Sequence, residues 1–200
     1  MEIRLARESD AEAILSVYAP YIRNTAVTFE CEVPSPEEFR SRIRNISADY
    51  PYLVCVSDGS LVGYAYAHRQ MERAAYQWNA ELSVYLAGAY YGRGIGKALY
   101  GALLEILRLQ NVQNVYGGVT VPNAPSEALH GHFGFTRLGT YHDTGCKCGA
   151  WHDVAWFEKF LGDHGPEPKA FVPFRELDPN AVSAILRKYC PDFSTDCENP

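Results

Sequence analysis

Residues 79–96 decide the fold of this chain, and they read NAELSVYLAGAYYGRGIG. Polar and apolar side chains alternate over 79–86, which is the pattern of a strand with one buried face. A turn with glycine at every second position of 92–96 follows, and an amphipathic helix begins within it. The backbone N–H groups at such a helix start bind phosphate oxygens, so the stretch predicts a site for a pyrophosphate. The polar face of the strand carries Asn79, Glu81, Ser83 and Tyr85.

Spacing separates the ways in which a glycine-rich turn can bind a nucleotide. The Walker pattern would need glycine in place of Tyr91 and serine or threonine in place of Ala98. The Rossmann pattern would need a third glycine where Lys97 stands. Both nucleotide patterns therefore fail. The glycines alone are equally consistent with a loop that only turns tightly.

The surrounding sequence predicts a mixed α+β domain. A capping box at Ser9–Glu12 begins a helix that Pro20 should kink or end, and Ser35-Pro36 begins a second helix that runs to about Ser47. Asp58-Gly59 predicts a tight hairpin. A short helix should follow residues 122–126, and the proline- and glycine-rich extension should hold one more helix from Pro179 to Tyr189. Further strands are expected at about residues 2–6, 52–57, 61–68, 114–121, 135–142 and 151–160.

Composition limits the function classes. The 200 residues carry a formal net charge of -6 and no dense lysine or arginine run, so we expect no nucleic-acid partner. No window has the length of apolar sequence that a signal peptide or a membrane span needs, so we expect a cytoplasmic protein without a membrane partner. The six cysteines should be reduced thiols. A zinc site fits poorly because Cys-x-Cys is not the usual ligand spacing, and we expect no metal. The residues of that weak zinc pattern are His142, Cys146, Cys148 and His152.

The combination of motifs closely resembles the acetyl-CoA-binding half of GNAT acetyltransferases. It consists of the strand ending in residues 83–86, the glycine-rich turn, Asn123 followed by Ser126, and Gly134-Phe135. Tyr91 departs from the family loop, which usually begins with arginine or glutamine. Residues 73–78, 80–85, 122–126 and 147–153 are further similar to the phosphinothricin and methionine sulfoximine acetyltransferases. The resemblance covers about residues 2–160, with Cys146 and Cys148 as departures.

The resemblance implies a fold, a cofactor and an acceptor. We expect a GNAT domain over residues 1–161, with a mixed, mostly antiparallel sheet flanked by helices, and a C-terminal extension with a helical tail over 162–200. Acetyl-CoA should be the acetyl donor, a small amino acid the amine acceptor, and the protein a homodimer. The expected cofactor-binding residues are Val84, Tyr85, Leu86, Gly92, Arg93, Gly94, Ile95, Gly96, Lys97, Asn123 and Ser126.

Acetyl transfer to an amine needs a group that accepts the ammonium proton and a group that protonates the departing thiolate. Glu81 matches the family's proposed base, and its alternative is a solvated carboxylate at a strand edge. His130 stands seven residues after Asn123, at the place of the proposed acid, and a surface histidine is its alternative. Backbone N–H groups near Val84 would stabilise the oxyanion. The expected substrate-binding residues are Phe29, Arg73, Tyr76 and Lys147.

Two other function classes fit the same motifs. One is a GNAT module that binds an acyl-CoA without turnover, and the presence of Glu81 and His130 argues against it. The other is an acetyltransferase for protein N-termini or polyamines. Basic residues in the expected pocket argue against polyamines because a polycation prefers carboxylates.

Overall fold

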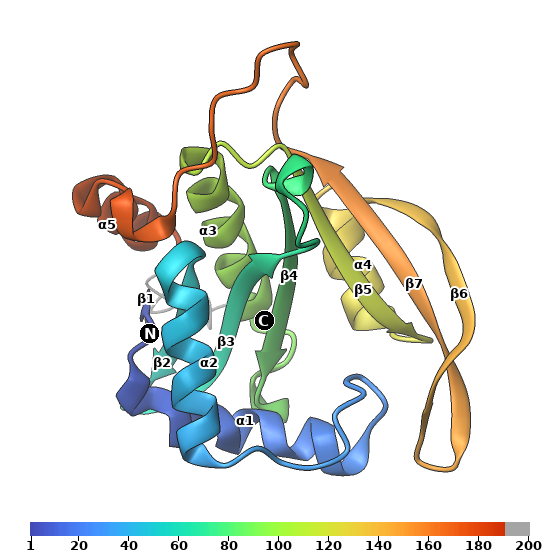
Figure 1. Cartoon of the computed structure of the whole chain (residues 1–200). Helices are drawn as coiled ribbons and strands as arrows, with labels where there is room; N and C mark the ends of the chain where they lie inside the picture. The colour runs from blue at the N-terminus through green and yellow to red at the C-terminus, as the bar shows by residue number, and fades with distance from the viewer. Residues whose placement is uncertain (191–200) are drawn as a thin grey trace, which may run out of the picture.

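The computed structural model describes residues 1–190, which form one seven-stranded sheet in the order β1-β2-β3-β4-β5-β7-β6. Neighbouring strands are antiparallel except β4 and β5, which run parallel (Figure 1). The predicted mixed, mostly antiparallel α+β sheet is therefore confirmed. The strands are β1 (Glu2–Leu5), β2 (Tyr52–Ser57), β3 (Ser60–Arg69), β4 (Asn79–Leu86), β5 (Asn114–Val121), β6 (Thr136–Lys147) and β7 (Ala150–Phe160). The α-helices within this range are α1 (Ala11–Asn24), α2 (Pro36–Asp49), α3 (Ile95–Leu109), α4 (Ala124–His132) and α5 (Pro179–Lys188).

Local sequence signals explain most element ends. Asp58 and Gly59 both take positive φ, 51° and 77°, in the tight hairpin between β2 and β3. The Ser35 hydroxyl accepts a hydrogen bond from the Glu38 N–H at 3.1 Å and caps α2 as predicted.

Two local predictions near the N-terminus are wrong. Instead of a Ser9 capping box, Glu8–Asp10 form a 3₁₀ turn in which the Asp10 carboxylate binds the Arg7 N–H and the Arg4 guanidinium. Pro20 does not end α1, since the helix continues to Asn24. Pro20 lies on the exposed side of the helix.

The sheet is covered differently on its two faces. On one face, α3 packs over the apolar side chains of β1 to β4, with Leu99, Leu103 and Leu107 fully buried. On the other face, α1 and α2 cover β2 and β3 through a second cluster built around Tyr52 and Tyr64. The alternation of β4 follows from this arrangement, since Ala80 and Leu82 face α3 while Tyr85 faces α1.

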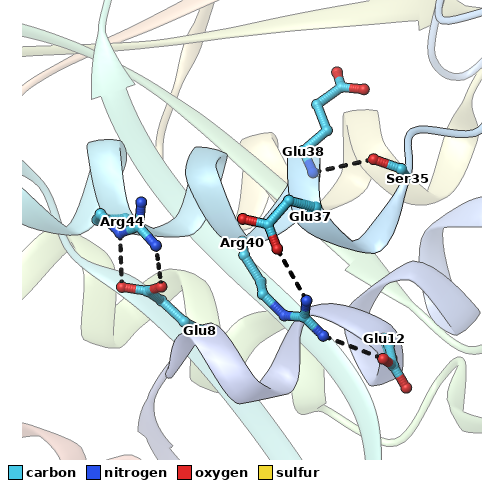
Figure 2. A network of polar contacts seen from close by, with 7 residues as sticks. All are labelled: Glu8, Glu12, Ser35, Glu37, Glu38, Arg40 and Arg44. Carbon is cyan, nitrogen blue, oxygen red and sulfur yellow. Dashed lines mark hydrogen bonds and ion pairs between the residues drawn. The ribbon is translucent and has the colours of Figure 1, made fainter.

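Charged side chains join α2 to the start of α1 (Figure 2). The Arg44 guanidinium donates two hydrogen bonds to the Glu8 carboxylate, the longer at 2.9 Å. Arg40 reaches Glu12 at 3.2 Å and Glu37 at 3.1 Å. These pairs are solvent-exposed, so each contributes only about 0–1 kcal/mol. They orient the two helices, and the apolar cluster beneath stabilises the contact.

Strands β4 and β5 separate halfway along their length. Their pairing covers only Asn79↔Asn114, Ala80↔Val115 and Glu81↔Tyr116. Figure 1 shows the two strands close at their starts and apart at their arrowheads. The fork begins directly after Glu81.

The C-terminal extension packs against its own domain. Val182 of α5 is 4% exposed and belongs to the α3 core. The Tyr189 hydroxyl donates to the Glu105 carboxylate at 2.6 Å, and the Tyr189 ring lies against Gly101, where any Cβ would collide with it. The part of the extension beyond residue 190, including Cys197, lies outside the described residues. None of the helices in residues 1–190 is both long and apolar enough to cross a bilayer.

Truncation after Leu161 should lower the thermal midpoint and the free energy of unfolding. It would expose the apolar surface under Val182 and remove the carbonyl of Val172, which accepts from the fully buried Gln110 amide at 2.9 Å. Val182→Ala in the full chain should cost about 1–3 kcal/mol. Thermal and urea unfolding measure both effects. Unchanged midpoints would mean that the extension is not part of the folded unit.

Candidate functional site

The fork between β4 and β5 exposes backbone groups of β4. The Ala87 N–H donates to the Val62 carbonyl at 2.8 Å, so the odd-numbered peptide groups of β4 point toward β3. The peptide groups of Val84 and Leu86 consequently point toward β5, which has already diverged. Within residues 1–190, the Val84 N–H and C=O have no backbone partner. They can pair with an extended ligand lying in the fork as a strand would.

The Leu86 peptide is satisfied by a side chain instead. The Tyr21 hydroxyl of α1 donates to the Leu86 carbonyl at 2.6 Å and accepts from the Leu86 N–H at 3.3 Å. The peptide of Tyr85 points to β3, and its ring packs against Tyr18 and Tyr64. Of the predicted cofactor-binding residues 84–86, the geometry therefore leaves only Val84 with an open peptide group.

A small cleft of about 60 Å³ lies in the fork. Val84 and Ser83 line it from β4, and Asn123, Ser126 and His130 line it from α4 and the residue before it. The Asn123 side chain caps α4 by accepting the Ser126 N–H at 3.3 Å. Val84, Asn123, Ser126 and His130, which belong to separate sequence motifs, thus meet at one opening.

The glycine-rich turn lies at the far end of the same strand. Gly92 and Gly94 have φ of 74° and 78°, which other residues rarely adopt, and α3 begins at Ile95. The first N–H groups of α3 have no partner within the helix and suit phosphate oxygens. A Cβ on Gly96 would lie 3.6 Å from the Leu86 side chain, so the turn adjoins the end of β4.

The polar side chains of the turn are exposed, whereas Ile95, the first residue of α3, is buried. The Arg93 guanidinium lies over the Tyr90 ring at 4.9 Å, and Lys97 faces solvent on the first turn of α3. Tyr91, which replaces the usual cation of the family loop, pairs its hydroxyl with that of Tyr21. Arg93 and Lys97 are the nearest basic residues to the turn in sequence.

Glu81 lies at the vertex of the fork. It is half-buried, and it faces His68 across β3 and Tyr116 across β5. Burial raises the pKa of its carboxyl, and the nearby His68 opposes that rise. A carboxylate whose proton affinity is raised by burial is suited to accept a proton from an ammonium group.

His130 is buried rather than on the surface. Its Nδ1 lies 2.8 Å from the Ser126 carbonyl and therefore carries the proton, so Nε2 accepts from the Tyr100 hydroxyl at 3.0 Å. Burial lowers the pKa of the ring, which favours the neutral form. The ring lies over Gly117, where a Cβ would come within 2.2 Å of Nε2. A neutral ring with Nε2 as acceptor is not prepared to donate a proton, so the acid role of His130 stays a prediction.

A second and larger pocket of about 330 Å³ lies on the sheet face that carries Glu81. Asn79 and Tyr116 belong to its wall and flank Glu81, one two residues earlier on β4 and the other opposite it on β5. Trp156 of β7 packs over Gly118, which lines the fork cleft, so the two openings share a boundary. The complete lining is Gln70, Met71, Tyr76, Asn79, Tyr116, Leu138, Gly139, Tyr141 and Trp156.

The four predicted substrate-binding residues do not gather at one point. Tyr76 lines the larger pocket, whereas Arg73 is exposed at the start of the same short 3₁₀ turn. The Lys147 ammonium is nearly buried and donates to the Thr28 carbonyl at 2.6 Å. Phe29 packs against Gly145 and His152. Phe29 and Lys147 therefore join the loop between α1 and α2 to the β6–β7 hairpin.

The weak zinc pattern is dispersed in the structure. His142 pairs with Asp153 at 2.9 Å, and His152 bonds the Lys147 carbonyl at 2.9 Å. Among residues 1–190 no group of three or more metal-ligating side chains converges.

A family model described as an acetyltransferase (GNAT) domain matches residues 3–156. The chain therefore belongs to the GNAT acetyltransferase family, and the enzyme class and fold predicted from sequence are confirmed. The open Val84 peptide and the glycine-rich turn fit the family's donor, acetyl-CoA, because they offer unpartnered backbone groups for an extended chain and for phosphates.

Several of the similar proteins are N-acetyltransferases whose names give a small acceptor. Phosphinothricin N-acetyltransferase of Streptomyces coelicolor is 35% identical over 165 residues, covering 80% of this chain and 96% of the relative. The L-methionine sulfoximine/L-methionine sulfone acetyltransferase of Salmonella typhimurium is 28% identical over 168 residues, covering 82% and 96%. The crystal structure of a phosphinothricin acetyltransferase from Sinorhizobium meliloti, in complex with acetyl-CoA, matches with a TM-score of 0.82 and 32% identity, covering 86% and 95%.

Sequence reasoning missed Tyr21, which bonds the Leu86 carbonyl, and several residues of the two openings, among them Tyr100, Tyr116 and Trp156. The first two sit on helices within apolar stripes, where a tyrosine is indistinguishable from core. Tyr116 and Trp156 lie on β5 and β7, and their sheet face carries no covering helix. A large aromatic side chain on a strand face without a covering helix indicates a binding surface, and that pattern could have identified these two residues.

Gly94→Val should raise the KM for acetyl-CoA at least about tenfold, because valine resists a φ of 78° and the N–H groups would lose their alignment. The amine KM should hardly change. Gly131→Ala is a matched control, since a Cβ there meets open space. Steady-state kinetics on variants with native circular dichroism measure both. An unchanged KM for acetyl-CoA in folded Gly94→Val would remove the turn from the donor site.

Glu81→Gln should lower kcat roughly 10²- to 10⁴-fold at neutral pH with little change in acetyl-CoA affinity. The wild-type rate should rise with pH as the Glu81 carboxyl, with its raised pKa, loses its proton. The variant lacks that dependence, and it should recover partly at high pH as the substrate amine becomes neutral. Glu158→Gln is a matched control, because Glu158 flanks Tyr116 from the opposite strand. Near-normal turnover of Glu81→Gln at pH 7 would leave Glu81 as a residue that only shapes the pocket.

Proposed function

We propose that this enzyme transfers the acetyl group of acetyl-CoA to the α-amino group of a small amino acid. One observation carries the proposal. The half-buried Glu81 carboxyl stands at the vertex of the fork, between the cleft with the open Val84 peptide and the flank of the 330 Å³ pocket. A base between a donor opening and an acceptor opening is the arrangement that acyl transfer to an amine requires.

In this proposal each residue has a limited task. The Val84 N–H donates to the developing oxyanion in the fork, and Glu81 takes a proton from the ammonium group, directly or through one water. Asn123 and Ser126 shape the inner wall of the cleft. His130 and Tyr100, which are joined by a hydrogen bond and both line the cleft, are the two candidates for returning a proton to the thiolate.

The larger pocket supports an acceptor with a small, uncharged side chain. Four of its lining residues are aromatic, Tyr76, Tyr116, Tyr141 and Trp156, and among residues 1–190 no lysine, arginine or carboxylate lines it. Arg73, beside the pocket on the same 3₁₀ turn, is our candidate for the substrate carboxylate because guanidinium groups bind carboxylates in a bidentate manner. The names of the similar proteins support amino acids of the methionine sulfoximine and phosphinothricin type.

We also propose a homodimer in the cytoplasm. The β6–β7 hairpin leaves Tyr141, Trp151 and Phe160 each about 60% exposed, together with Leu138 at 54%. Exposed apolar side chains spread along an edge hairpin favour contact with a second chain. The cytoplasm is proposed because it supplies acetyl-CoA.

A panel of amines tests the acceptor. Methionine sulfone and methionine sulfoximine should be acetylated with a kcat/KM at least about tenfold above that of phosphinothricin, because an uncharged aromatic pocket penalises an anionic phosphinate. A polyamine and an N-terminal peptide should be poorer still. Release of free thiol from acetyl-CoA measures all five. A clear preference for phosphinothricin would show that a cation such as Arg73 reaches into the pocket, and a preference for the peptide would replace the proposed acceptor.

A further inference from the structure

The segment after β7 runs across the end of the sheet at which β4 and β5 begin. The Leu161 N–H donates to the Gln113 carbonyl at 2.7 Å, and the Val172 N–H donates to the Gln110 carbonyl at 3.0 Å. Between them, the Asn111 amide donates to the Ala170 carbonyl at 2.8 Å. We call residues 161–172 the strap. Both of its ends are bonded to the connection between α3 and β5.

Two further hydrogen bonds of the strap lead toward the larger pocket. The Trp78 indole N–H donates to the Lys169 carbonyl at 2.7 Å. His164 Nε2 lies 2.6 Å from Asn114 Oδ1, and the Asn114 amide donates to Asn79 Oδ1 at 2.9 Å. Since Asn114 uses its N–H on Asn79, its oxygen must accept, so His164 is the donor.

These contacts lead to residues that line the 330 Å³ pocket, the proposed site of the amine acceptor. Asn79 lines the pocket, and so do Gln70, Met71 and Tyr76 from the loop between β3 and β4. Trp78 is the last residue of that loop, and its carbonyl accepts from the N–H groups of Gln113 and Asn114 at 2.9 Å and 3.1 Å. Trp78 is therefore held twice, through its backbone carbonyl at the start of β5 and through its indole N–H at the strap.

The geometry at His164 is specific. Its φ of 52° is uncommon for a residue other than glycine, and the edge of its ring packs against Phe160 at 4.8 Å between centroids. Gly162 allows the strap to approach closely, since a Cβ there would lie 1.9 Å from the Gln113 amide oxygen. The positive φ of His164 and the close approach at Gly162 together place the His164 N–H within hydrogen-bonding distance of Asn114. A segment that only held the extension in place would need neither feature.

We propose that the strap is a positioning element of the acceptor pocket, acting through Trp78 on the β3–β4 loop and through His164 and Asn114 on Asn79. The inference rests on the proposed function, because it takes the 330 Å³ pocket as the amine site. The strap lies beyond residue 156, where the match to the family model ends. It would therefore adjust the acceptor side of a common catalytic domain in this chain.

The test is a comparison of three full-length variants. Trp78→Phe keeps the ring and loses the indole N–H, His164→Ala removes the donor to Asn114, and Tyr189→Phe is the matched control. Tyr189→Phe breaks the other end of the extension, at Glu105, away from the pocket. Trp78→Phe and His164→Ala should each raise the amine KM about 3- to 10-fold, the loss expected from one hydrogen bond. The KM for acetyl-CoA and kcat should change little, and Tyr189→Phe should change neither KM.

Hydrogen–deuterium exchange supplies a readout that does not depend on turnover. Trp78→Phe and His164→Ala should speed amide exchange in residues 70–79, and Tyr189→Phe should not. Equal changes in both KM values, or an unchanged amine KM with unchanged exchange, would overturn the positioning role. An inactive wild type toward every amino acid would instead overturn the proposed function, while faster exchange in residues 70–79 would still support the strap as a support for the loop.

Discussion

The parting of β4 from β5 is the constraint on which the rest of the site depends. A sheet interior normally pairs every peptide group, and an unpaired buried group costs about 1–3 kcal/mol. Here the pairing stops at Glu81 and Tyr116, so the remaining half of β4 must find other partners. The Tyr21 hydroxyl satisfies both polar groups of the Leu86 peptide, and the Val84 peptide is left open to the cleft. The proposed donor site is thus an interruption in the sheet that an extended ligand would complete.

The same parting sets the electrostatics of Glu81. Glu81 is the last residue of β4 that pairs with β5, so its backbone is fixed by strands on both sides. Its side chain lies on the sheet face that carries the larger pocket. Partial burial raises the pKa of the carboxyl, and the neighbouring His68 limits the rise. A base held by two strands at the boundary of two openings needs no loop movement to reach its proton.

Sequence patterns could predict the donor side because its determinants are local. The alternation of β4, the three glycines and the Asn123 cap all act within a few residues, and the structure has each where it was expected. Alternation does not reveal which peptide groups face the fork, so Tyr85 was grouped with Val84 although its peptide bonds β3. The same limit applies to His130: spacing located it at the cleft, but its neutral state results from its burial in the folded chain, which spacing does not reveal. Pro20 shows the converse, since an exposed proline can sit inside a helix when apolar packing on the opposite face stabilises it.

The acceptor side has no such local code. Its wall comes from the β3–β4 loop, β4, β5, β6 and β7. Hydrogen bonds from the strap reach Trp78 at the end of that loop and Asn114 at the start of β5, and Asn114 in turn bonds Asn79 of β4. The β3–β4 loop, β6, β7 and the strap can change without disturbing the glycine-rich turn or Glu81, because none of them supplies the peptide groups of the fork. Identity of about a third with named enzymes is therefore enough to establish the chemistry, which the local motifs carry. It is a weaker guide to the acceptor, which depends on long-range contacts that include a segment outside the family match.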